Sequence, residues 1–256
     1  RQEFIKDLKT RYGQAIKFVA DYGETDGDEI PQDFFAMMNW MMEMLNPSPK
    51  EYTEPSVAIV YVDGMIQEGA VEPSPFGTPE GAFSTTIRKA LDEAADDGSV
   101  KAVVLRVDSP GGSALASEII WNATQRVAAK KPFVVSMGNV AGSGGYYVSC
   151  GAETIFADHT TITASIGVLS GKLVTTGGWD KLGIHWHTER RGEMAGILGS
   201  SAPFNDAERA KIRKYMDEVY GVFKKRVVDG RKSKLTKPID EVAGGRDRLA
   251  YRLGHS

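Results

Sequence analysis

The residue best suited to do chemistry in this 256-residue chain is a serine that stands between glycines. Ser143 lies in residues 139–147, which read NVAGSGGYY, between a stretch that predicts a strand and a stretch that predicts a helix. Small neighbours let a substrate carbonyl approach the serine hydroxyl, and the N-terminus of a helix stabilises negative charge. The segment is therefore a candidate nucleophile turn, although a glycine-rich turn without any function fits the same residues.

A second glycine-rich turn could supply the hydrogen-bond donors that such a nucleophile needs. Residues 108–112 read DSPGG and directly follow the apolar stretch 100–107, which predicts a strand. A strand that enters a helix through Pro-Gly-Gly leaves backbone N–H groups pointing outward, as an oxyanion hole requires. A tight turn without function explains the same residues, so the motif alone leaves both interpretations open. A third hydroxyl, Ser165 in the run TASIG, is by itself typical of a strand end.

Alternating strands and helices must position these turns. Apolar runs at 57–62, 100–107, 132–137 and 154–157 predict buried strands, and helical patterns at 84–94, 113–129 and 142–150 lie between them. This alternation predicts right-handed βαβ crossovers, a mostly parallel sheet and therefore the α/β class. Later in the chain, Asn205 is the expected N-cap of a long amphipathic helix.

The first fifty residues differ in pattern from the rest. Apolar spacing predicts helices over residues 1–45, with several methionines near the end of that range, and a proline-rich segment follows. We therefore predict a helical connector, or the tail of a preceding half, at 1–50 and one α/β domain at 51–256. The chain begins with Arg1 and shows no signal peptide, so a membrane anchor is expected outside it.

Composition excludes several classes of function. The net charge of −3 lacks the basic excess that is typical of a nucleic-acid surface. A single cysteine, Cys150, rules out an internal disulfide and a cysteine-rich zinc site, and we expect it to be buried. Four histidines leave little basis for a histidine-rich metal centre. His159 is expected in a loop, whereas His185 and His187 alternate on a predicted strand.

Three segments together resemble the signal peptide peptidase A family of serine proteases, peptidase family S49. They read KAVVLRVDSPGG, KPFVVSMGNVAGSGGYYVS and TITASIGV. The resemblance implies a ClpP/crotonase-like spiral of ββα units with flanking helices, and no metal or other cofactor. It also implies that Ser143 is the nucleophile and that Ser165 orients the general base. The N–H groups of Gly111 or Gly112, together with that of Gly144, would form the oxyanion hole.

The family's general base is a lysine, and this chain has Ala195 at the position where that lysine is expected. Lys172, Lys181 and Lys211 do not match it and are expected on solvated surfaces. Three explanations remain open: a carboxy-terminal half of a tandem member, whose lysine comes from the other half, an engineered Lys→Ala form, or a natural pseudo-enzyme. A histidine base is not supported, because Val168 occupies the position where ClpP-type enzymes place it.

By this resemblance the protein is a serine endopeptidase that degrades remnant signal peptides or similar hydrophobic peptides at the membrane. The family's members are homo-oligomers whose sites are shared between units, and the catalytic domain is expected on the extracytoplasmic side of a bacterial membrane. The alternative is a catalytically incomplete half that binds peptides or partners without cleaving them. A crotonase-like acyl-CoA enzyme is a third possibility, which the surroundings of Ser143 and Ser165 argue against.

Overall fold

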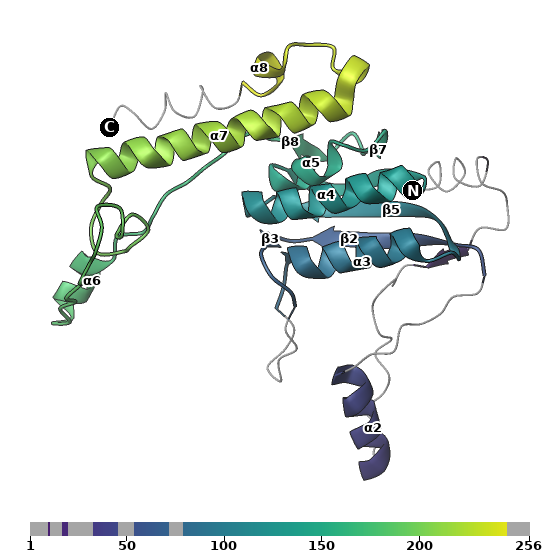
Figure 1. Ribbon diagram of the computed structural model, residues 1–256, viewed down its shortest axis with the longest axis horizontal. Helices are drawn as coiled ribbons and strands as arrows, with labels where there is room; N and C mark the ends of the chain where they lie inside the picture. The colour runs from purple at the N-terminus through teal and green to yellow at the C-terminus, as the bar shows by residue number, and fades with distance from the viewer. Residues whose placement is uncertain (1–9, 11–16, 20–32, 46–53, 72–78, 245–256) are drawn as a thin grey trace. The chain divides into compact units, whose positions relative to one another are not determined.

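The computed structural model describes residues 10, 17–19, 33–45, 54–71 and 79–244, and the chain divides into two compact units (Figure 1). The first unit comprises residues 1–165 and 227–236, and the second comprises residues 166–226 and 237–256. The boundary predicted at residue 50 falls in a segment outside the described residues. It therefore stays a prediction.

Two short elements are described in the N-terminal region. α2 (Phe34–Leu45) confirms the methionine-rich helix, and the side chains of Phe34, Phe35 and Met42 are exposed. The helix predicted over the preceding residues is wrong at β1 (Lys17–Val19), which pairs in parallel with the next strand of the sheet. Aromatic and β-branched residues favour a strand where a sheet edge offers hydrogen-bond partners, and here the edge overrides the helical spacing.

A parallel sheet forms the centre of the first unit. Its order is β1-β2-β5-β6-β7, with β2 at Ser56–Asp63, β5 at Val100–Ser109, β6 at Phe133–Gly142 and β7 at Thr154–Phe156. Valine-rich runs form these strands because branched side chains pack well on a pleated surface. The register pairs Val60 with Leu105, and Leu105 with Val135. The predicted strands and their parallel arrangement are thus confirmed.

Along the chain, β2 and β5 are each followed by a short extended segment of a second, smaller sheet layer and then by a helix. β2 leads to β3 (Ile66–Gln67), which pairs with β4 (Ala82–Phe83) before α3 (Ser84–Asp96) begins. β5 leads to Gly112, which forms a bridge with Ile66, and then to α4 (Ala114–Lys130). β6 leads directly to α5 (Gly144–Ser149). This repetition confirms the predicted α/β class and its ββα units with flanking helices.

Two helices cover one face of the sheet. α3 and α4 lie side by side along it (Figure 1), and Leu91 and Ile120 are fully buried together with Val62 and Leu105. Full burial of an aliphatic side chain is worth about 1.5–3 kcal/mol relative to exposure. The opposite face carries a smaller buried apolar cluster that includes Val104. Strands that are buried on both faces have continuous apolar runs, which explains why the sequence predicts them well.

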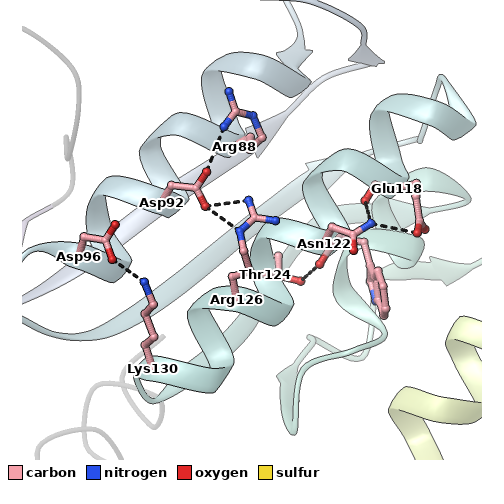
Figure 2. Close-up of polar contacts among 9 residues, drawn as sticks. Arg88, Asp92, Asp96, Glu118, Asn122, Thr124, Arg126 and Lys130 are labelled. Carbon is pink, nitrogen blue, oxygen red and sulfur yellow. Dashed lines mark hydrogen bonds and ion pairs between the residues drawn. The ribbon is translucent and has the colours of Figure 1, made fainter.

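Two ion pairs join α3 to α4, and a third lies within α3 beside them (Figure 2). Arg126 reaches one oxygen of the Asp92 carboxylate at 2.7 Å, and Arg88 approaches the other at 3.1 Å. Lys130 contacts Asp96 at 2.5 Å, and this hydrogen bond holds the pKa of the Asp96 carboxyl below its ordinary range. Exposed pairs of this kind add little stability.

The second unit contains α6 (Thr176–Lys181), most of α7 (Asp206–Arg231) and α8 (Ile239–Val242). Asn205 caps α7, as predicted. Its side-chain oxygen accepts a hydrogen bond from the Glu208 N–H at 2.8 Å, and the Glu208 carboxylate accepts one from the Asn205 N–H at 3.0 Å. These reciprocal bonds form a capping box, which satisfies two N–H groups at the start of the helix.

Lys172 lies inside the second unit, where the sequence predicts a solvated position. Its side chain is 6% exposed, and its ammonium is 3.9 Å from the Glu208 carboxylate and 4.4 Å from the centre of the Phe204 ring. The prediction is wrong because the aliphatic stem packs inside while the charged end meets a carboxylate and a ring face. Lys181 and Lys211 are exposed, as predicted.

Candidate active site

Ser143 occupies a sharp turn between β6 and α5. Its backbone has a φ of 49° and a ψ of −116°, and residues other than glycine rarely adopt a positive φ. Two hydrogen bonds of 2.9 Å hold the turn: the Ser143 N–H donates to the Ala164 carbonyl, and the Ser143 carbonyl accepts from the Tyr147 N–H. Such a conformation costs about 1–3 kcal/mol and persists only where the surrounding structure enforces it.

The DSPGG turn packs directly against this serine. Gly111 has a φ of +102°, and a Cβ atom built there would lie 2.6 Å from the Gly144 nitrogen and 2.8 Å from the Ser143 Cβ. Only glycine fits both the conformation and the space. A Cβ on Gly144 would in turn lie 3.2 Å from the Gly111 Cα. The fold therefore brings the two glycine-rich turns into direct contact.

The backbone donors at this contact differ in availability. The Gly111 N–H donates to the Ser109 Oγ at 3.1 Å and is therefore already engaged. No hydrogen bond described in the structure uses the Gly112 N–H, and the Gly112 nitrogen lies 3.3 Å from the Cβ position of Gly144. Gly144 is the first residue of α5, and the first N–H groups of a helix have no partner within the helix. Of the two glycines that the sequence leaves open, Gly112 fits the donor role better.

Ser165 lies beside the nucleophile turn because β8 (Ile162–Ala164) extends along the far end of β6. Gly142 pairs with Ala164, and the Cβ position of Gly142 is 3.6 Å from the Ser165 Cβ. Ser165 is exposed and has a φ of 48°. Its hydroxyl can therefore exchange a hydrogen bond with a group that enters the site from solvent.

A tyrosine anchors α5 to the neighbouring helix α4. The buried Tyr147 donates from its hydroxyl to the Glu118 carboxylate. Cys150, at the end of α5, is fully buried, as predicted. Burial also raises the pKa of the Tyr146 hydroxyl, which therefore stays protonated at neutral pH. These contacts give Ser143 a packed helix as its support.

Ala195 belongs to the second unit, where it is exposed and lines a cavity of about 480 Å³. Trp179 and Trp186 line the same cavity, and their ring centres lie 6.2 Å apart in an edge-to-face arrangement. Arg190 and Arg191 complete its polar side. None of the described residues that line this cavity is a lysine.

Two of the histidines lie in a part of the second unit where the sequence pattern predicts the wrong secondary structure. The strand predicted to carry His185 and His187 and to end near Thr188 does not form, and the described part of this unit contains no sheet for it to join. His185 is exposed and contacts Asp180 at 3.1 Å, and the exposed His187 contacts Glu189 at 2.6 Å. His159 lies in a turn, as predicted. Among the described residues, no group of three or more acidic, histidine or cysteine side chains could hold a metal ion.

The fold and these contacts define an α/β protein in which a serine with a strained backbone packs against a second glycine-rich turn at the end of a parallel sheet. Comparison with known proteins shows which family of α/β proteins this chain resembles. The model of peptidase family S49 matches residues 125–250, which contain Ser143, Ser165 and Ala195. Protease 4 of Haemophilus influenzae is 35% identical over 247 residues, which cover 94% of this chain and 38% of that protein. The chloroplastic serine protease SPPA of Arabidopsis thaliana is 32% identical over 192 residues, 74% of this chain and 28% of that protein.

The chain belongs to peptidase family S49 and is related to the SppA proteases, as its motifs predict. It spans well under half the length of these two relatives. Among solved structures, a ClpP1 variant from Listeria monocytogenes matches with a TM-score of 0.39 and 10% identity, over 73% of this chain and 77% of that chain.

Proposed function

We propose that this chain is the nucleophile-bearing domain of a serine endopeptidase that uses a Ser/Lys dyad. One observation carries the proposal: in a chain of family S49, Ser143 sits at positive φ in a turn that packs against the DSPGG turn. A backbone strained at one serine and packed against outward N–H donors is an arrangement that serves acyl transfer.

The reaction follows from these atoms. The Ser143 hydroxyl oxygen adds to the carbonyl carbon of a peptide bond, while its proton passes to a general base. The carbonyl oxygen becomes an oxyanion, which accepts hydrogen bonds from the N–H groups of Gly112 and Gly144. Collapse of this intermediate breaks the C–N bond, and the base returns the proton to the leaving amine. In the second half of the reaction, the base takes a proton from water as the water oxygen adds to the ester carbon of the acyl-enzyme; the ester C–O bond then breaks and the proton passes to the Ser143 oxygen.

This chain has no general base at position 195, where the family's lysine is expected. Ala195 has no ionisable group, so the proposal assigns the base to a lysine from another half of the protein or from another chain. A lysine acts as a base at neutral pH only where burial disfavours its ammonium form. The exposed hydroxyl of Ser165, next to the nucleophile turn, would then accept a hydrogen bond from the lysine and orient it.

Hydrophobic peptides such as remnant signal peptides are the proposed substrates, by analogy with a relative whose name is putative signal peptide peptidase SppA. We also propose a homo-oligomer with sites shared between units, and a position at a membrane on its extracytoplasmic side. No helix among the described residues is both long and apolar enough to cross a membrane.

The test is cleavage of a quenched fluorescent peptide with an apolar sequence by the intact protein. Ser143→Ala should abolish turnover and leave the melting temperature nearly unchanged, because the loss of one oxygen leaves only a small void. Ser99→Ala, a serine in the turn that precedes β5, is the matched control and should cleave normally. Turnover by Ser143→Ala near the wild-type rate would show that another residue is the nucleophile.

A second candidate function, peptide binding without cleavage, is favoured by Ala195 alone. It predicts that the wild-type protein binds the same peptide but turns none of it over. Binding without turnover in the intact wild-type protein, measured by fluorescence anisotropy, would therefore replace the peptidase proposal with this one.

A further inference from the structure

β6 carries an irregularity just before the nucleophile. Val107 of β5 pairs with Met137 of β6, but Ser109 pairs with Ala141, so two steps on β5 correspond to four on β6. The two additional residues form a bulge at residues 138–140. Bulges bend a strand and redirect the side chains that follow it, and they are common next to active sites.

One carboxylate fills this bulge. The two oxygens of Asp108 accept hydrogen bonds from consecutive backbone groups, the Asn139 N–H at 3.1 Å and the Val140 N–H at 3.0 Å. Asp108 leaves no space for a side chain at Gly138, where a Cβ atom would lie 2.3 Å from a carboxylate oxygen. The Thr161 hydroxyl donates to the Gly138 carbonyl at 2.8 Å and holds the bulge from its other side. Carboxylate and glycine thus form a matched pair across two strands.

The bulge decides where Ser143 lies. After it, β6 pairs with β8 and the Ser143 N–H reaches the Ala164 carbonyl, which brings the nucleophile against Gly111. Without the two additional residues, the register of Val107 with Met137 would continue regularly along the strands. Ser143 would then shift by two residues relative to the DSPGG turn, which is about 7 Å at a rise of about 3.3 Å per residue.

We propose that Asp108 is a positioning residue for the nucleophile: by binding two N–H groups of the β6 bulge, it fixes the register that places Ser143 beside its oxyanion donors. This inference rests on the proposed function. Asp108 itself touches neither Ser143 nor a substrate in this scheme. Its expected effect therefore falls on the rate of acylation and much less on peptide binding.

The experiment compares Asp108→Asn and Asp108→Ala in the intact protein with Val135→Ala as a matched control. Val135 lies on β6, the strand that carries the bulge, and is fully buried, so its truncation lowers stability without touching the bulge. We expect Asp108→Ala to lower kcat by about 100-fold or more, with a small change in KM, because a misplacement of 1 Å can cost that much. Asp108→Asn keeps the side-chain shape and one acceptor oxygen and should retain intermediate activity. The control should lose melting temperature but keep kcat.

Amide hydrogen exchange supplies a second measurement that does not depend on activity. At 139, 140 and 143 the amides should exchange faster in Asp108→Asn than in wild type, and at wild-type rates in Val135→Ala. If the wild-type protein cleaves nothing but this exchange pattern appears, the proposed function fails and the positioning role stands. If Asp108→Asn shows wild-type exchange at these amides, or Asp108→Ala keeps a wild-type kcat, Asp108 does not position the nucleophile.

Discussion

A single methyl group added at Gly111 should disable the site while the protein stays folded. In Gly111→Ala the new Cβ would lie 2.6 Å from the Gly144 nitrogen and 2.8 Å from the Ser143 Cβ. Ordinary contacts between such atoms begin near 3.5 Å, so the two turns must separate by about 1 Å. A displacement of that size at the reacting atoms can lower the rate by about 100-fold.

The same substitution has a separate cost in stability. A side chain at a positive φ costs about 1–2 kcal/mol, which lowers the melting temperature by roughly 2–8 °C in a protein of this size. The assays are kcat/KM with an apolar peptide and thermal unfolding of the intact protein. Gly98→Ala is the matched control, because no atom lies within 4 Å of its Cβ position and its φ is not positive. A Gly111→Ala protein that folds and cleaves at the wild-type rate would refute the packing of the two turns.

Two further predictions concern the base and the surface. If the lysine was lost from a single-chain site, Ala195→Lys should create an acylation burst with an activated ester, and the burst should disappear when Ser143→Ala is added. The absence of a burst from a folded Ala195→Lys variant would support a lysine from another half or chain. Lys130→Ala should raise the pKa of Asp96 towards its ordinary value, as followed by NMR titration, because the Lys130 hydrogen bond is the main cause that lowers it. In the native protein this pair's contribution to stability is present above the ordinary pKa of an aspartate and is lost as the pH falls through the lowered one. An unchanged Asp96 titration in Lys130→Ala would show that the pair in Figure 2 does not persist in solution.

The sequence predicts the central sheet well because a parallel sheet buried on both faces needs unbroken apolar strands. Runs such as 100–107 meet that need and match β5 closely. The two glycine-rich turns are predictable because only glycine fits where Gly111 packs against the turn at Ser143. The identity of the family follows from the same three segments.

Other features depend on partners that lie far along the chain, and sequence pattern does not reveal them. β1 forms because a sheet edge is available, and the segment that carries His185 and His187 forms no strand because the described part of its unit offers no such edge. The Lys172 side chain is buried because the Glu208 carboxylate and the face of the Phe204 ring lie close to its ammonium group. The role proposed for Asp108 depends on a bulge about thirty residues later, and its signal in the sequence is Gly138, a glycine inside the run that predicts β6.

The central claim is that Ser143 is a nucleophile, and covalent labelling tests it most directly. The intact protein would be treated with a fluorophosphonate probe, digested and mapped by mass spectrometry. We expect one modified serine, Ser143, with labelling that slows greatly in Gly111→Ala and continues normally in Ser99→Ala. A protein that acquires its label on any other serine, or that stays unlabelled while it cleaves peptides, would contradict the account.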